Sequence, residues 1–342
     1  MAVNTPVNRQ WLLAARPTGR PLREDDFRYH EAAVPEPADG EILVKSLYFG
    51  FDPAQKGWME NKSSYAAPTE LDAVVRGFAA GRVLRSRAAG IAEGDTVYGQ
   101  WGWQDYAAFR PVDDPSIFEV IPADRPIPAA LGVLGMTGLT AYFGLFDIGR
   151  PVAGDTVVIS GAAGATGSVA GQLAKIAGCR VIGTAGGPDK ARWLTEEFGF
   201  DAVIDYKSEH VGKRLRALCP NGVDVYFDNV GGAILNTVLA RLAPRARVVI
   251  CGGIARYSQD GSVPGPENYF NLVFMRARME GFLVSDYLSR FAEAKQRLWR
   301  WIEDGRLKYR VDIQDGFANA PHTLIRLFEG QNFGKQLLKL EE

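Results

Sequence analysis

The spacing of hydrophobic and polar positions changes near residue 127 and divides the chain into two parts. Before that point, short β-prone runs alternate with turn sequences rich in Pro, Gly, Asp and Glu. The clearest runs span residues 41–45, 73–76 and 95–98. Short strands separated by turns in this way predict a compact domain of the β-barrel type.

Beyond residue 128 the pattern alternates between strands and helices. A helical stretch at 129–145 is interrupted by Gly135 and Gly138. After it, strand-like runs occupy residues 156–160, 180–184, 202–205, 223–228, 246–250 and 279–284. This alternation predicts an α/β domain with a doubly wound parallel sheet. A long helix ending near Gly305, a short strand, a helix near Leu324 and a strand at 336–339 follow, and we expect them to return to the first domain. The predicted domains are 1–127 with 286–342, and 128–285.

A glycine turn follows the first strand of the second domain, with the sequence G-A-A-G-A-T-G at residues 161–167. In this spacing the first glycine permits a tight turn and the second lets backbone N–H groups approach a pyrophosphate. The third lets the next helix pack closely on the sheet. A strand–helix turn without a ligand is the alternative, but the surrounding strand–helix alternation favours a dinucleotide site.

The end of the second strand predicts which dinucleotide is bound. An NAD site usually has a carboxylate about 20 residues after the glycines, which binds the ribose 2′-hydroxyl. Residues 184–190 read T-A-G-G-P-D-K, which leaves room for a 2′-phosphate, with Lys190 and Arg192 as candidate counter-charges. Asp189 follows a proline and is interpreted as a first-turn residue of the next helix. We therefore expect NADP, and a solvated Lys190 is the alternative.

Composition and charge narrow the class of protein. The 342 residues suffice for two domains with full cores. Lys and Arg total 39 against 40 Asp and Glu, and this balance argues against binding to nucleic acid or to an acidic membrane surface. No apolar run approaches the roughly 20 residues of a membrane-spanning helix, and no apolar leader is evident. Because Cys179, Cys219 and Cys251 are too scattered for a disulfide framework, we expect a cytoplasmic protein.

A catalytic zinc site is not expected. Such a site needs Cys, His or carboxylate ligands, and residues 31–178 contain neither Cys nor His. No C-x-x-C motif occurs, and His30, His210 and His322 are isolated in the sequence. We expect no bound metal.

The motif G-M-T-G-L-T-A at 135–141, ahead of the glycine turn, resembles the zinc-independent medium-chain dehydrogenases/reductases. Y-F-D-N-V-G-G at 226–232, C-G-G-I-A-R-Y at 251–257 and N-F-G-K at 332–335 resemble the leukotriene B4 dehydrogenase/prostaglandin reductase/double-bond reductase branch. The resemblance extends from residue 9 to residue 339. It implies a Rossmann domain joined to a GroES-like substrate domain, and NADPH-dependent reduction of the C=C bond of α,β-unsaturated ketones and aldehydes.

The resemblance also implies which residues bind the cofactor. The pyrophosphate would lie on Gly164, Ala165, Thr166 and Gly167, and the 2′-phosphate on Lys190 beside Tyr206. The path from adenosine to nicotinamide would be lined by Asn229, Cys251, Gly252 and Tyr257, and the nicotinamide flanked by Phe282, Leu283, Val284 and Asn332. Core packing is the alternative for Tyr206, Phe282 and Val284. Asn229 and Asn332 need polar partners whether or not they bind the cofactor.

Tyr257 is the candidate catalytic residue. Hydride transfer to the β-carbon leaves charge on the carbonyl oxygen as an enolate, which needs a positioned donor. A phenol at the end of the 251–257 loop fits that need, alone or with the nicotinamide ribose 2′-hydroxyl. The alternative is that Tyr257 only shapes the cofactor pocket.

The first substrate loop departs from the family pattern. Many relatives read D-P-Y-M-R, whereas this chain reads D-P-A-Q-K at 52–56, which loses the pocket tyrosine and the arginine. The candidate pocket residues are Asp52, Trp58, Tyr65 and Trp103. These aromatic residues fit an apolar pocket for an aryl or alkyl enone, and equally the core of a barrel.

Two other functions stay open from the sequence. An NADPH:quinone oxidoreductase has the same fold without a metal, and a non-enzymatic NADPH-binding protein is compatible with the fold. The resemblance also implies a homodimer, in which the last strand of the second domain would pair edge to edge with a second copy.

Overall fold

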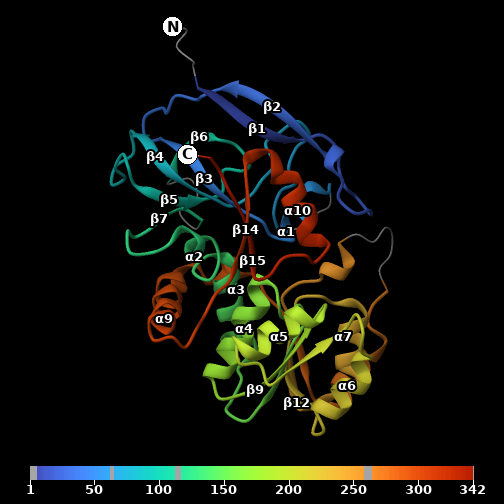
Figure 1. Cartoon of the computed structure of the whole chain (residues 1–342). Coiled ribbons are helices and arrows are strands. Elements are labelled where there is room, and N and C mark those ends of the chain that lie inside the picture. The colour runs from blue at the N-terminus through green and yellow to red at the C-terminus, as the bar shows by residue number, and fades with distance from the viewer. Residues whose placement is uncertain (1–5, 62–64, 112–116, 258–263, 342) are drawn as a thin grey trace. The chain divides into compact units, whose positions relative to one another are not determined.

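The computed structural model describes residues 6–61, 65–111, 117–257 and 264–341. The chain forms two compact units, one of Met1–Leu131 with Asp312–Glu342 and the other of Gly132–Val311. Figure 1 shows the course of the chain by residue number. Residues 286–311, which the sequence pattern assigned to the first domain, group with the second unit. The reason is packing: Arg297 of α9 (Phe291–Glu303) donates a 2.8 Å hydrogen bond to Tyr142 Oη of α3 (Met136–Phe143).

The first unit is built on an antiparallel sheet. Its strand order is β14 (Val311–Asp315), β15 (Lys335–Lys339), β3 (Ile42–Gly50), β4 (Ala79–Ser86), β5 (Thr96–Gly99) and β7 (Glu119–Val120), with β6 (Tyr106–Phe109) also paired to β3. A separate hairpin joins β1 (Val7–Leu13) to β2 (Phe27–Ala33). The strand expected at 73–76 is absent, because that segment pairs with β1 only through a bridge between Leu12 and Val74.

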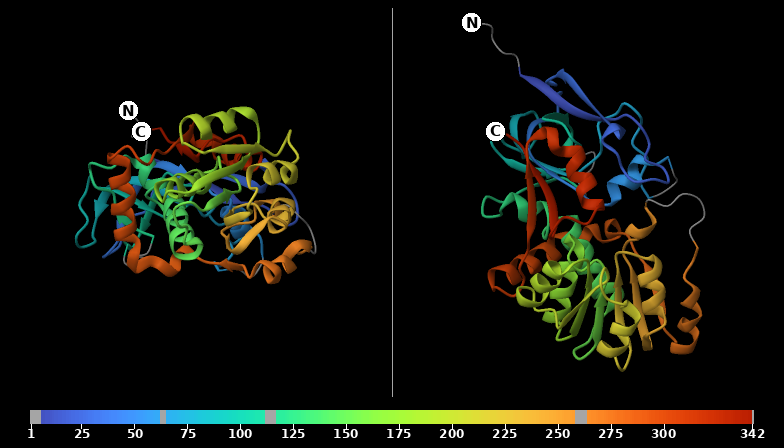
Figure 2. Two further views of the ribbon diagram at one scale, coloured as in Figure 1. Left: turned by 90° about the horizontal axis from the view of Figure 1, so that it is seen from below. Right: turned by 45° about the vertical axis from the view of Figure 1, so that its right-hand side comes forward.

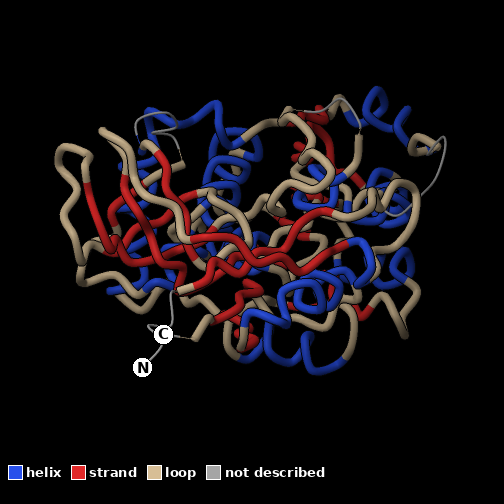
Figure 3. Tube along the Cα trace, turned by 90° about the horizontal axis from the view of Figure 1, so that it is seen from above, coloured by secondary structure: helices blue, strands red, loops and turns tan. Residues whose placement is uncertain are grey.

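Helices are few and short in the first unit, which consists mainly of strands and loops (Figure 3). They include α1 (Ala54–Met59), α2 (Ile127–Leu131) and α10 (Ala320–Phe328). Residues 129–145 were expected to be helical, with interruptions at Gly135 and Gly138. The helix is interrupted here: α2 ends at Leu131 and α3 begins at Met136, with Gly135 as its N-cap. A Cβ at Gly138 would collide with the backbone carbonyl of Val133, so only glycine allows this close turn.

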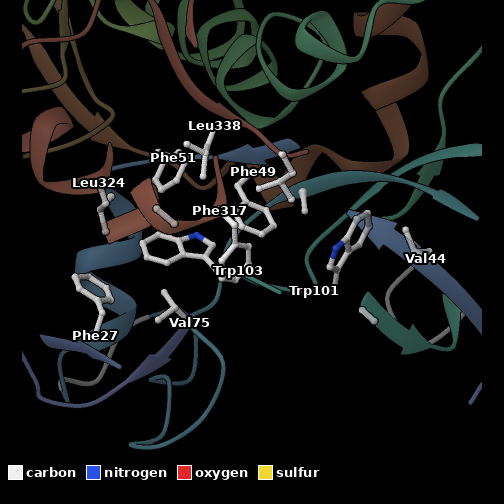
Figure 4. Close-up of a cluster of buried hydrophobic side chains, with 14 of the residues drawn as sticks. Phe27, Val44, Phe49, Phe51, Val75, Trp101, Trp103, Phe317, Leu324 and Leu338 are labelled. Carbon is white, nitrogen blue, oxygen red and sulfur yellow. The ribbon is translucent and has the colours of Figure 1, made fainter. Parts of the chain in front are cut away.

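Aromatic side chains fill the core of the first unit (Figure 4). Trp103 is completely buried, with its ring centroid 5.4 Å from that of Phe27 and 5.2 Å from that of Phe51. Phe317 reaches the same cluster from the C-terminal segment. Trp101 lies beside Phe109, and its indole donates a 2.9 Å hydrogen bond to Ser46 Oγ.

The second unit contains the parallel sheet that the sequence predicted, and this confirms the α/β fold class. Its strand order is β10 (Ala202–Asp205), β9 (Arg180–Ala185), β8 (Thr156–Ile159), β11 (Val223–Asp228), β12 (Leu242–Ile250) and β13 (Arg278–Gly281). The order reverses at β8, as in a doubly wound dinucleotide-binding fold. Helices lie on both sides of the strands (Figure 2) and include α4 (Ala165–Ile176), α5 (Pro188–Glu196), α6 (Val211–Leu218) and α7 (Gly232–Leu239).

The helices among the described residues are too short or too polar to cross a membrane.

Candidate cofactor and substrate sites

The glycine turn at the end of β8 forms a cradle for an anion. Gly161 has a φ of +58°, and Gly164 is the N-cap of α4 without a side-chain capping bond. A Cβ at Gly167 would collide with the Gly161 carbonyl oxygen, so the close turn requires glycine. Among the described residues, no acceptor reaches the backbone N–H groups of Ala165, Thr166 and Gly167. These N–H groups lie at the N-terminus of α4, which is the positive end of the helix dipole, so the cradle suits the negative charge of a pyrophosphate.

A buried carboxylate ties together the loops around this cradle. Asp228, at the end of β11, has no exposed surface and accepts hydrogen bonds from Ser160 Oγ at 2.8 Å and Tyr226 Oη at 2.7 Å. Its carboxylate also accepts the backbone N–H of Gly231 at 3.0 Å, and its carbonyl accepts that of Cys251 at 2.9 Å. Burial and the Asp228 charge raise the pKa of Tyr226 well above 10, so the phenol stays a donor. Sequence analysis missed this network, whose only signal was an acid closing an apolar strand.

Asn229 follows Asp228 and is held by the same network. Its backbone N–H donates to Ser160 Oγ at 2.9 Å and its Nδ2 to the Ser160 carbonyl at 2.7 Å. The Asn229 carbonyl accepts the N–H of Ile254 at 3.3 Å. Asn229 therefore lies between the glycine turn and the 251–257 loop.

The end of β9 gathers cationic and phenolic groups. A Cβ on Gly186 would lie 2.8 Å from Tyr206 Oη and 2.9 Å from Lys207 Cε, so both side chains lie over this glycine. Asp205 accepts the Gly187 N–H at 2.8 Å, which lowers the pKa of its carboxyl. Lys190 lies in the first turn of α5. Lys207 was missed by sequence analysis.

Asp189 and Arg192, the acid and the second cation near the end of β9, form an ion pair with each other. Asp189 lies in the first turn of α5, as expected, and the pair is on the exposed side of the helix. Both side chains are therefore engaged with each other.

The 251–257 loop is held against β11 by backbone hydrogen bonds. The N–H of Gly252 donates to the Asp228 carbonyl at 3.0 Å, and that of Ala255 to Val230 at 3.1 Å. Tyr257, half-buried, closes the short 3-10 turn Ile254–Arg256. Loss of hydration raises the pKa of the Cys251 thiol to about 12, so this sulfur is neutral at physiological pH.

Residues 282–284 follow the edge strand β13. A Cβ on Gly144 would lie 2.6 Å from the ring of Phe282 and 2.8 Å from that of Phe227, so Phe282 packs over this glycine. Leu283 is exposed, and Val284 begins the 3-10 helix Val284–Arg290. The strand expected at 279–284 thus ends at Gly281.

The substrate-loop segment 52–56 is anchored by two lysines. Lys335 Nζ lies 2.6 Å from Asp52 Oδ1 and donates to the Phe51 carbonyl at 3.2 Å. Lys56 has no exposed surface; its Nζ lies 2.6 Å from Glu60 Oε1 and donates to the Pro17 carbonyl at 3.1 Å. Lys56, in the place of the family's arginine, therefore stabilises the fold of α1.

An aromatic row begins on α1. The indole N–H of Trp58 lies 3.2 Å from Tyr65 Oη, and the ring of Trp58 meets that of Phe78 edge to face at 6.3 Å. Phe78 in turn stacks on Tyr98, with the centroids 5.5 Å apart. The Arg76 guanidinium lies 5.9 Å from the Trp58 centroid. Sequence analysis named neither Phe78, directly before β4, nor Tyr98 on β5, because an aromatic residue beside or within a short β-prone run carries no pocket signal.

Two other candidates lie in the first unit. Trp103 belongs to the hydrophobic core and offers no surface to a ligand. Of the two interpretations given for this residue, core packing is the one that the structure shows. Asn332 is buried and donates from Nδ2 to the Gly334 carbonyl at 2.9 Å.

The described residues do not fit a metal ion: no three His, Cys, Asp or Glu side chains among them are grouped as ligands. His210 is instead the N-cap of α6 and accepts the Lys213 N–H.

Comparison with known proteins identifies the family. A model for the N-terminal domain of oxidoreductases matches residues 9–117, and a model described as zinc-binding dehydrogenase matches residues 165–304. The chain is 38% identical to the NADPH-dependent curcumin reductase of Escherichia coli and 35% identical to the NADP(+)-dependent 2-alkenal reductase of Nicotiana tabacum, over 97% of each chain. The chain belongs to the zinc-independent branch of the medium-chain dehydrogenases/reductases.

A solved structure of this family extends the match to three dimensions. CurA from Vibrio vulnificus in complex with NADPH has a TM-score of 0.92 and 38% identity to this chain, covering 98% of it and 99% of the CurA chain. Family membership confirms the resemblance drawn from the sequence motifs. The second family model carries zinc in its description, yet the described residues offer no ligand set for it.

Proposed function

We propose that this protein reduces the C=C bond of α,β-unsaturated ketones and aldehydes with NADPH. The observation that carries the proposal is the pairing of an open anion cradle at the start of α4 with a cationic strand end at β9. The nearby carboxylate of Asp205 is engaged by Gly187 and by Ser208 Oγ at 2.7 Å, so it does not compete for a ribose hydroxyl. The activities named for the curcumin and alkenal reductases support the choice of substrate.

NADPH fits the residues of the second unit. The free N–H groups of Ala165, Thr166 and Gly167 would hold the pyrophosphate, and Lys190 with Lys207 the 2′-phosphate, beside Tyr206. Asn229, Cys251 and Gly252 would line the path to the nicotinamide, which Phe282, Leu283, Val284 and Asn332 would flank. When bound, NADPH supplies the hydride for the β-carbon of the substrate.

Tyr257 would donate a hydrogen bond to the substrate carbonyl oxygen, where negative charge collects as the enolate forms. The ribose 2′-hydroxyl would share this task. A donor positioned for that oxygen lowers the barrier because it stabilises the charge only as it develops. Water or the Tyr257 phenol would then protonate the α-carbon, which completes the addition of two hydrogens.

Asp52, Trp58 and Tyr65 would form the substrate side of the site. Ala54 stands where relatives carry tyrosine, so we expect room for a bulky group beside α1. Trp58, Phe78 and Tyr98 are themselves almost completely buried, so Tyr65, which is exposed, is the aromatic residue that would offer its ring to a planar, apolar substrate. Trp103 is left out of this pocket because it is buried in the core.

The test is NADPH oxidation at 340 nm with an aliphatic enone, an aryl enone, an enal and a quinone, each repeated with NADH and with EDTA. We expect EDTA-insensitive, NADPH-selective turnover of the enones. Turnover of the quinone alone would assign the protein to the quinone oxidoreductases. Tight NADPH binding without turnover of any acceptor would make it a binding protein.

We also propose a homodimer joined at β13. This strand is the last of the parallel sheet, and exposed apolar side chains lie close to it in the chain: Tyr269, Phe270, Val273, Phe274 and Met279. Edges of this kind are usually covered in the native assembly. Light scattering should give twice the chain mass, and Phe274→Asp should reduce it to the monomer, whereas Leu84→Asp, in the first unit, should not.

We propose a cytoplasmic location, on the ground that Cys179, Cys219 and Cys251 are all free thiols. Cell fractionation with the protein at its native level would test it.

A further inference from the structure

A second group of charges lies at the other end of the parallel sheet from the glycine turn. A groove of about 400 Å³ is lined by Ala246 and five arginines: Arg150, Arg245, Arg247, Arg276 and Arg278. Arg247 of β12 is in register with Arg278 of β13, and also with Val225 near the start of β11. The cofactor cradle follows the carboxyl end of β8, whereas this groove lies at the amino ends of the strands. The two sites are therefore at opposite ends of the same parallel sheet.

The backbone of this groove is unusual. Among the described residues, four that are not glycine have a positive φ, and three of them are Arg150 at 45°, Arg245 at 63° and Arg276 at 51°. An L-residue in this region costs roughly 1 kcal/mol, and glycine would avoid it. Arginine thus occupies three positions where the local backbone favours glycine, and all three side chains belong to one groove.

Two of the five arginines are held in place by neighbours. Arg247 forms an ion pair with Asp155 and donates from Nε to the Gly149 carbonyl at 2.9 Å. Arg278 donates to the Ile148 carbonyl at 2.6 Å and lies 3.8 Å from Glu280. These contacts fix two guanidinium groups in the groove.

The remaining charge is not compensated. Among the residues that the structure describes, the Arg150 side chain donates only to a backbone carbonyl, that of Asp147 at 2.8 Å. The side chains of Arg245 and Arg276 are exposed and have no hydrogen bond or ion pair among the described residues. The five arginines of the groove outnumber by three the carboxylates that form ion pairs with them, those of Asp155 and Glu280, in a chain whose net charge is −1.

We propose that this groove binds a small polyphosphate, such as the di- or triphosphate group of a metabolite. Guanidinium groups match phosphate oxygens in pairs of parallel hydrogen bonds, and several of them converge here from separate segments. The groove holds a few phosphate groups, whereas a nucleic acid would need a continuous basic surface that an acidic chain lacks. The site is independent of the reductase function proposed above. Arg278 lies on β13, so the proposal requires the arginine side of this strand to stay accessible beside the homodimer contact proposed for its edge.

The test is calorimetric titration of inorganic tripolyphosphate into the full chain saturated with NADP+, at 150 mM NaCl, so that the cradle of α4 is closed to the probe. We expect saturable binding to the wild-type protein. Arg245→Gly and Arg276→Gly should each weaken it roughly tenfold, as expected for the loss of a charge-assisted hydrogen bond. Glycine suits the left-handed backbone, so neither variant should unfold at a lower temperature than the wild type.

The matched control is Arg300→Ala on the exposed side of α9 in the same unit, which should leave the affinity unchanged. Absence of binding to the wild type would overturn the proposal, as would equal weakening by Arg300→Ala. Equal affinity for citrate would overturn the preference for phosphate. A change of oligomeric state in Arg276→Gly, with tripolyphosphate binding intact, would assign that residue to a protein interface instead.

Discussion

Replacement of Asp228 by asparagine tests whether one buried carboxylate holds the cofactor loops together. Its Oδ1 accepts Ser160 Oγ, Tyr226 Oη and the N–H of Val230 and Gly231, and its Oδ2 lies 3.1 Å from the Gly231 N–H. An asparagine can keep its oxygen at the Oδ1 position only by placing its NH2 group against that N–H. Two donors would then face each other in a fully buried place.

The expected cost follows from these contacts. Four hydrogen bonds lose their charge assistance, and one N–H loses its second acceptor. At a few tenths of a kcal/mol for each weakened bond and about 1–2 kcal/mol for the donor–donor contact, Asp228→Asn should lower the free energy of unfolding by about 2–4 kcal/mol. Because Asn229 and Cys251 depend on the same residue, NADPH affinity should fall at least tenfold in conditions where the variant is folded.

Urea unfolding followed by tryptophan fluorescence measures the first quantity, and titration of NADPH fluorescence the second. Asp304→Asn, at the exposed C-cap of α9, is the control and should change neither. Tyr226→Phe removes one donor and should cost only about 1 kcal/mol. If Asp228→Asn unfolds at the wild-type urea concentration and binds NADPH equally well, the carboxylate does not organise the site.

Further predictions concern the cradle, the proposed donor, the buried ion pair and the thiols. Gly167→Ala should weaken NADPH binding at least tenfold, measured by fluorescence titration, because its Cβ collides with Gly161; an unchanged affinity would place the cofactor elsewhere. Tyr257→Phe should lower kcat far more than it raises the Kd for NADPH, and an unchanged kcat would refute the donor role. Lys56→Met should lower the free energy of unfolding by about 3–5 kcal/mol in urea, since it breaks a buried pair with Glu60; a loss below 1 kcal/mol would contradict this. Loss of hydration raises the pKa of Cys179 and Cys219 to about 11 and of Cys251 to about 12, against an ordinary value of 9.0. The folded state therefore holds these protons longer than the unfolded state, so stability should be full below pH 9 and fall between about pH 9 and 12 in urea titrations at successive pH values. Iodoacetamide at pH 8.5 should accordingly label the native protein far more slowly than the unfolded one.

The sequence was most informative where local rules and burial agree. Each strand of the parallel sheet is a short apolar run bounded by turn residues, so the strands and their helices were predictable one by one. The same holds for the glycine turn, because the spacing of its three glycines already predicted the close packing found at Gly167.

What the sequence did not predict depends on contacts between distant segments. Asp228 is one acid among 40 acidic residues until folding buries it beside Ser160. Lys207 becomes a candidate for the 2′-phosphate only because the end of β10 places it over Gly186. Trp103 was a pocket candidate because the side chain of an aromatic residue on a loop can point into a pocket or into the core. In the structure it is buried in the core of the first unit.

The pairing of β15 with β3 has a consequence for how the chain folds during synthesis. Leu337 pairs with Gly50, so β3 gains this neighbour only after residues 335–339 have left the ribosome. The second unit is continuous in sequence, between Gly132 and Val311, and can complete its sheet earlier. At translation rates of about 5–20 residues per second, the roughly 200 residues between Leu131 and Lys335 delay closure of the first unit by about 10–40 s. During that interval the Tyr48–Gly50 end of β3 lacks its β15 partner, whereas Ile42–Lys45 can already pair with β6. A cell that makes this protein quickly must keep that open end from pairing with another nascent chain.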